Sequence, residues 1–63
     1  MNNLKTWLTH KNMTQGELAE ALGYSRIYIH LIVNGKRPIT PAFEWKFYKR
    51  FGGAEQRAAF SKE

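Results

Sequence analysis

The sequence contains no cysteine, only two prolines and no long apolar segment. Without cysteine the chain forms neither disulfides nor cysteine-ligated zinc sites, so a reducing compartment is the natural expectation. No apolar run approaches the roughly 20 residues of a membrane span, and the polar, interrupted N-terminal segment is unlike a signal peptide. We therefore expect a cytoplasmic protein that uses no metal, no cofactor and no small-molecule ligand.

Acidic residues are also scarce, because five Asp/Glu stand against ten Lys/Arg and give a net charge of +5. Residues 26–50 hold six of the ten basic residues and only one of the five acids. A localised positive surface indicates a polyanionic partner, nucleic acid before membrane, although a merely solubilising surface is the alternative. The few acids do not cluster, so we expect no enzyme activity. At 63 residues the chain is expected to be a single domain, residues 1–63.

The apolar residues recur at helical spacing, which predicts an all-α, compact domain of four to five helices. Leu4, Trp7 and Leu8 mark one face of a first helix, for which Asn2 or Asn3 is the candidate N-cap. A second helix is expected at about residues 14–22. It begins with a capping box formed by Thr14 and Glu17 and ends at Gly23.

The stretch GYSRIYIHLIVNG, residues 23–35, is ambiguous, because its alternating branched and aromatic residues also suit a β-strand. Ser25 at its start and Asn34-Gly35 at its end are helix signals, and we predict a third helix at about 25–33. Its relation to the second helix decides between the alternatives. Ala19 provides the small residue where two helices cross, and Gly23 provides the turn. The inner-face apolar residues of this predicted helix-turn-helix are Leu18, Leu22, Tyr24, Ile29 and Ile32.

A fourth helix is predicted to start at Thr40-Pro41 and to end at Gly52-Gly53. Phe43, Phe47 and Phe51 recur every four residues and form the expected core stripe. Trp45 lies about 200° from Phe43 around this helix, so it either packs beneath the tail with Phe60 or is exposed to a partner. The tail, residues 54–63, is expected to be a weak helix and a possible dimer contact.

The run MTQGELAEALGYSRIYIHLIVNGKRPIT resembles the lambda-repressor-like, Cro/XRE-type helix-turn-helix family, with its helix 2, turn, recognition helix and basic loop. The stretch NGKRPITP is also similar to the related HigA-type antitoxin branch. The resemblance covers about residues 4–52. This sequence departs from the family at Glu44, where a small core-facing apolar residue is usual, at the larger Tyr24, and in the aromatic richness of the fourth helix.

The resemblance implies a DNA interface on the recognition helix and its flanks. Arg26 suits bidentate contact with guanine, and Ile27 suits contact with a thymine methyl, unless it belongs to the core. The expected base-contacting residues are Arg26, Ile27, Tyr28 and His30. The expected phosphate-contacting residues are Gln15, Ser25, Asn34, Lys36 and Arg37.

The function implied is sequence-specific binding of double-stranded DNA by a Cro-like transcriptional repressor in a bacterial or phage-infected cell. Proteins with this motif usually bind pseudo-palindromic sites as two-fold dimers. The expected homodimer contact comprises Trp45, Tyr48 and Phe60. The alternatives are an antitoxin whose main partner is a small toxin and, with less support, an RNA-binding protein, since no RNA-module signature or stacking platform is evident.

Overall fold

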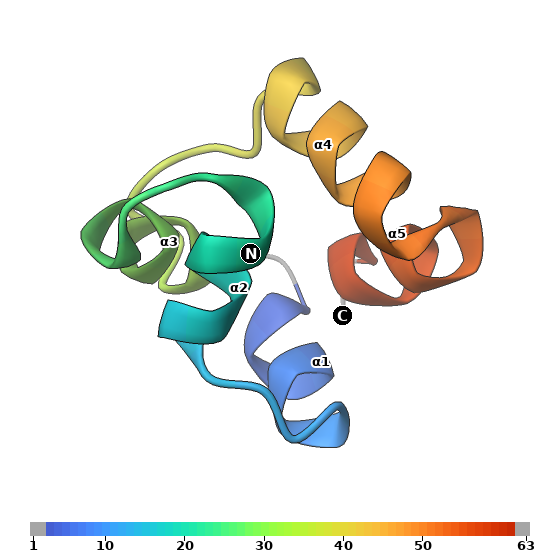
Figure 1. Cartoon of the computed structure of the whole chain (residues 1–63), viewed down its shortest axis with the longest axis horizontal. Helices are drawn as coiled ribbons and strands as arrows, with labels where there is room; N and C mark the ends of the chain where they lie inside the picture. The colour runs from blue at the N-terminus through green and yellow to red at the C-terminus, as the bar shows by residue number, and fades with distance from the viewer. Residues whose placement is uncertain (1–2, 62–63) are drawn as a thin grey trace.

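The computed structural model describes residues 3–61, which contain five α-helices and no strand (Figure 1). The molecule measures 25 × 24 × 23 Å along its principal axes. The helices are α1 (Leu4–His10), α2 (Gln15–Leu22), α3 (Arg26–Val33), α4 (Pro41–Phe51) and α5 (Gly53–Phe60). The predicted all-α domain with a helix-turn-helix is confirmed. Asn3 is the N-cap residue of α1 but makes no side-chain capping bond, and Asn2, the other candidate, lies outside the described residues.

Three of the predicted helix starts are capped by a side-chain hydroxyl. Thr14 Oγ1 accepts the Glu17 N–H (3.1 Å) while Glu17 Oε1 accepts the Thr14 N–H (2.8 Å), which completes the capping box of α2. Ser25 Oγ accepts the Tyr28 N–H at 3.1 Å, and Thr40 Oγ1 accepts the Phe43 N–H at 3.1 Å. Each such cap satisfies an amide that the helix itself leaves free, and typically contributes about 1 kcal/mol.

The stretch that resembled a β-strand is the helix α3. Gly23, with φ 78°, takes the left-handed conformation that ends α2 and lets the chain turn into α3. Gly35, with φ 73°, follows the last turn of α3, where the Lys36 N–H donates to the Leu31 carbonyl at 2.8 Å. The alternating pattern is therefore misleading, and the relation of this stretch to α2, through Ala19 and Gly23, indicates its conformation correctly.

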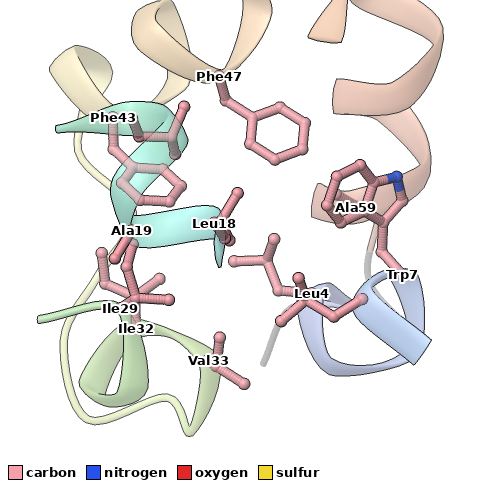
Figure 2. Close-up of a cluster of buried hydrophobic side chains, with 12 residues drawn as sticks. Leu4, Trp7, Leu18, Ala19, Ile29, Ile32, Val33, Phe43, Phe47 and Ala59 are labelled. Carbon is pink, nitrogen blue, oxygen red and sulfur yellow. The ribbon is translucent and has the colours of Figure 1, made fainter. Parts of the chain in front are cut away.

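A single apolar core lies between the helices, and side chains from all five converge on it (Figure 2). Trp7 of α1 is buried, and its ring meets Phe47 and Phe51 edge-on at 5.0 and 5.1 Å between centroids. The buried residues are Leu4, Trp7, Leu8, Leu18, Ala19, Leu22, Ile29, Ile32, Val33, Phe43, Phe47 and Ala59. The predicted inner faces of the first four helices therefore meet in this core.

The tail forms a regular helix that packs against α1 and α4. The Asn3 N–H donates to the Ala59 carbonyl at 3.0 Å, which joins the beginning of the described chain to its end. The Trp7 Nε1–H donates to Glu55 Oε1 at 2.9 Å, and Lys11 Nζ lies 2.6 Å from Glu55 Oε2. Hydrogen bonds from Lys11 and Trp7 hold the pKa of the Glu55 carboxyl below its ordinary value.

Both residue-level departures from the family pattern are accommodated. Glu44 is exposed, so α4 presents Phe43 and Phe47 to the core and requires no small residue at position 44. Tyr24 is half-buried. Its ring stacks on that of Phe43 at 5.5 Å between centroids, and the ammonium group of Lys46, also on α4, lies 4.5 Å from the centroid of the Tyr24 ring. The larger side chain at position 24 thus extends the core toward α4.

Candidate nucleic-acid interface

The helix-turn-helix holds α3 against α2 mainly through the apolar inner face of α3. Ala19 is 3% exposed, and its carbonyl accepts the Tyr24 N–H at 2.9 Å across the turn. Ile29 and Ile32 are fully buried beneath α3. A small residue at position 19 allows this close packing, while the outer face of α3 remains available to a ligand.

The outer face of α3 combines a cation with an exposed aliphatic side chain. Ile27 is 72% exposed, the largest exposure among the large apolar residues of the described chain. It is therefore not a core residue, which removes the alternative that the sequence left open. Arg26 precedes it and is also exposed. An exposed guanidinium beside an exposed aliphatic group suits base edges and thymine methyls, although contact with bases stays a prediction.

A shallow hollow lies between the start of α2 and the outer face of α3. Its lining residues are Thr14, Gln15, Gly16, Arg26, Ile27 and His30. The aliphatic part of Arg26 crosses α2 at Gly16, where an added β-carbon would lie 3.5 Å from Arg26 Cδ. Gly16 was not recognised as part of the site from the sequence. The local signal is a glycine inside the first turn of a predicted helix, where glycine is unfavourable. The 3.5 Å separation is ordinary van der Waals contact, so the packing does not itself require a glycine.

Gln15, His30 and Asn34 form a polar cluster that bridges the two helices. His30 Nδ1 lies 3.2 Å from Gln15 Oε1 and 3.2 Å from Asn34 Nδ2. The Asn34 amide also donates to the His30 carbonyl at 2.8 Å. Three residues expected separately at the interface are thus brought into contact, at a helix N-terminus that favours anions.

Ser25 and Tyr28 are more constrained than the other predicted site residues. Ser25 Oγ caps α3, so its hydroxyl is already engaged with the Tyr28 amide. Tyr28 is half-buried, and its ring packs 4.8 Å from that of Tyr24. A base contact by Tyr28 stays a prediction. The packing limits that contact to whatever part of the side chain remains exposed.

The basic side chains of the loop after α3 are exposed to solvent. Asn34, Lys36 and Arg37 are exposed, and the Lys36 and Arg37 amides both donate to the Leu31 carbonyl. Within residues 3–61 the ion pair of Lys11 with Glu55 is the only salt bridge, so neither Lys36 nor Arg37 is neutralised by a carboxylate. Backbone bonds fix the loop while the charged ends stay available, as phosphate contacts would require.

The described part of the chain contains neither a metal-binding cluster nor a membrane-spanning helix. Residues 3–61 contain no group of three or more histidine and acidic side chains that could hold a metal ion. None of the five helices is long and apolar enough to cross a membrane.

Comparison with known proteins agrees with this geometry. Residues 4–43, which run from the start of α1 into α4, match the model of the helix-turn-helix family of the Cro/C1 type. No curated protein and no solved structure gave a significant match to the chain. The matched segment covers well over half of the chain and includes α2, the turn and α3. The chain therefore belongs to the Cro/C1-type helix-turn-helix family of DNA-binding transcription regulators.

Proposed function

We propose that this protein is a sequence-specific repressor that places α3 in the major groove of double-stranded DNA. The observation that carries the proposal is the outer face of α3, where Arg26 and Ile27 are exposed above a fully buried inner face. Arg26 would read guanine and Ile27 a thymine methyl. Tyr28 and His30 are the further candidates for base contact.

Phosphate contacts would hold the helix in register. Gln15 lies at the N-terminus of α2, and Asn34, Lys36 and Arg37 follow α3, so phosphates on both sides of the groove would be engaged. Ser25 would contact the backbone while it caps α3. The mechanism would be steric, because a bound protein covers promoter DNA without any chemical step. The site of action would be the cytoplasm, at the bacterial nucleoid or in a phage-infected cell.

We further propose that two copies bind one pseudo-palindromic operator, with their recognition helices in major grooves about 34 Å apart. Trp45 and Tyr48, which we call the α4 aromatic face, are 58% and 47% exposed, and their rings stack at 6.0 Å. Exposed paired aromatics are typical of protein interfaces. Phe60 instead packs on Phe47 at 5.0 Å, so the dimer contact would depend mainly on the α4 aromatic face.

Selection of bound sites from a random duplex library tests the proposal directly. We expect an enriched pseudo-palindrome whose half-sites contain guanine and thymine at the positions that face Arg26 and Ile27. The absence of any enriched sequence would contradict specific DNA reading. Sedimentation of the complex with operator-length DNA tests the dimer separately. A single subunit per duplex would rule the dimer out while leaving DNA reading intact.

A second candidate function is that of an antitoxin, in which DNA binding accompanies the neutralisation of a small toxin. The α4 aromatic face supports this alternative, because such a face serves a different protein as well as a second copy. Purification from the native host distinguishes the two functions. A stoichiometric small protein that is released by substitution of Trp45 would favour the antitoxin, and recovery of the chain alone would favour the repressor.

A further inference from the structure

Three basic residues share one side of α4. Lys49 and Arg50 follow Lys46 by three and four positions, so the three side chains are neighbours on the helix surface, and we call them the α4 basic stripe. All three are exposed. They line a shallow hollow that is completed by Ala21 and Leu22, at the end of α2. The stripe therefore lies where α4 meets the helix-turn-helix.

No carboxylate of the described chain forms an ion pair with the α4 basic stripe. The single salt bridge within residues 3–61 joins α1 to α5. At about 100° per residue, the acid on α4, Glu44, lies about 160° around the helix from Lys46. A helix C-terminus attracts cations, which accounts for Lys49 and Arg50 in the last turn of α4 but not for Lys46. The stripe thus presents three positive charges to an external anion.

Each cation of the stripe lies over an aromatic ring. The charged group is 4.5 Å from the ring centroid for Lys46 on Tyr24, 5.7 Å for Lys49 on Trp45 and 5.2 Å for Arg50 on Phe51. Such contacts are attractive and restrict the long basic side chains. Because a flexible side chain loses entropy when a ligand immobilises it, cations that are already restricted favour binding.

The stripe is connected to α3 through two ring contacts. The Lys46 ammonium lies over the Tyr24 ring, and the Tyr24 centroid is 4.8 Å from that of Tyr28 on α3. Tyr28 lies about 160° around α3 from Arg26. Arg26 lines the hollow at the start of α2 together with Gln15. The outer face of α3 is therefore flanked by the start of α2 on one side, and on the other by the rings that lead to the stripe.

We propose that the α4 basic stripe binds phosphates of the DNA strand that lies on the side of α3 opposite Gln15. This inference rests on the proposed DNA-binding function. The major groove, about 12 Å wide, is bounded by two phosphate backbones, so a helix in the groove has anions on both flanks. Gln15 and the N-terminus of α2 contact one backbone, and the stripe contacts the other. Because the stripe touches no base edge, it adds affinity without changing sequence preference.

The salt dependence of operator affinity tests the stripe. Each phosphate contact adds about 0.9 to the steepness of the logarithm of the binding constant plotted against the logarithm of salt concentration. Lys46→Gln should therefore make this slope shallower by about one unit. The double variant Lys46→Gln/Arg50→Gln should make it shallower by about two units, and it leaves Lys49 and the α4 aromatic face unchanged. Both variants should lose affinity equally for operator and unrelated duplexes.

Lys5→Gln is the matched control for Lys46→Gln. It removes the same charge from an exposed lysine on α1, which lies outside the stripe and outside the hollow between α2 and α3. At physiological salt, charges more than about 8 Å apart are largely screened. Lys46→Gln should therefore weaken operator binding several-fold, whereas Lys5→Gln should leave the slope and the affinity nearly unchanged.

Ethylation interference locates the phosphates concerned, because ethylation removes the charge of a single phosphate. With the unmodified chain, ethylation should interfere with binding at phosphates on both strands of each half-site. With Lys46→Gln/Arg50→Gln, interference should disappear on one strand and remain on the other, where the start of α2 binds. The same interference pattern with both proteins would overturn the proposal.

Three further results would decide against the stripe or against the proposed function. Equal changes of slope with Lys46→Gln and Lys5→Gln would show that only the net charge matters. A lower melting temperature of Lys46→Gln with an unchanged slope would show that the stripe serves the fold, and loss of a bound acidic protein with unchanged DNA affinity would assign it to a protein partner. If the unmodified chain prefers no duplex sequence but Lys46→Gln still makes the slope shallower, the stripe binds DNA and only the sequence-specific function fails.

Discussion

The helices α3 and α4 both have a buried face and an exposed apolar face, but they expose different chemistry. On α3 the exposed apolar group is the isolated aliphatic side chain of Ile27, surrounded by polar and cationic residues. On α4 it is a stacked pair of rings, Trp45 and Tyr48, with Lys49 Nζ 5.7 Å from the Trp45 ring centroid. A small apolar group among donors suits base edges, whereas a flat aromatic pair suits another protein surface.

The helices around these faces also differ in their place in the molecule. In Figure 1, α3 is at the left of the view and the end of α4 and α5 are at the right. Contact between α3 and the rest of the chain is made chiefly through α2, while α5 packs on α4 and α1.

The largest expected effect comes from the buried side of α4. Phe47 is fully buried and contacts the rings of Trp7, Phe51 and Phe60, so Phe47→Ala should cost about 3–5 kcal/mol of unfolding free energy. This loss is comparable with the whole stability of so small a domain. Thermal or urea unfolding measures it.

The control for this change lies two residues away on the same helix. Trp45→Ala removes a larger but mostly exposed ring, and the unfolding free energy should change by less than about 0.5 kcal/mol. Its effect should appear instead in the stoichiometry on operator DNA. Severe destabilisation by Trp45→Ala would show that the α4 aromatic face belongs to the core and would end the comparison with α3.

A smaller effect is expected on the outer face of α3. Arg26→Ala should leave the fold intact but cost about 1–3 kcal/mol of binding free energy on the preferred operator and relax the preference at one base pair. Lys36→Ala is the contrasting variant. It should weaken binding to all duplexes alike. The slope of the logarithm of the binding constant against the logarithm of salt concentration should become shallower by about one unit. An equal loss on every sequence with Arg26→Ala would reassign Arg26 to the phosphate contacts.

The smallest effect is expected at Glu55 of α5, whose carboxylate contacts Lys11 and Trp7. The pKa of Glu55 is lowered from its ordinary value of about 4.5, so its bonds to Lys11 and Trp7 stabilise the fold at pH values above 4.5. That stabilisation is lost as the pH falls through the lowered value. Glu55→Gln should therefore lower the melting temperature at pH 7 and differ little from the unmodified chain at the most acidic pH. If the difference in melting temperature between Glu55→Gln and the unmodified chain became larger as the pH falls, the stabilising role of the ionised Glu55 would be contradicted.

The elements predictable from the sequence were those specified by local signals. Thr14, Ser25 and Thr40 cap the helices at which they were expected, and Phe43 and Phe47 fall on the inner face that their spacing indicates. For α3 a local alternation of branched residues competed with these signals. The crossing at Ala19 and the turn at Gly23 provided the information that decided in favour of a helix.

The contacts that escaped prediction join parts of the chain that are far apart in sequence. The hydrogen bond from Trp7 to Glu55 joins residues 48 positions apart, and the spacing of residues along the sequence does not indicate such a pair. The placement of Phe60 on Phe43 and Phe47 depends on the angle between α4 and α5, which Gly52 sets with its φ of 99°. The contacts of His30 with Gln15 and Asn34 could likewise not be predicted, because they depend on how α2 and α3 lie relative to each other.

The bond between Asn3 and Ala59 has a consequence for how the domain can be joined to other segments. Asn3 also donates from its side chain to the Ala58 carbonyl at 3.1 Å, so the two ends of the described chain are fastened to each other. A short linker between these ends would close the backbone into a ring with little distortion. New termini could then be placed in the exposed loop of Lys36 and Arg37. In such a circular permutant, the two halves of the basic loop would be separate chain ends whose length and charge could be varied independently.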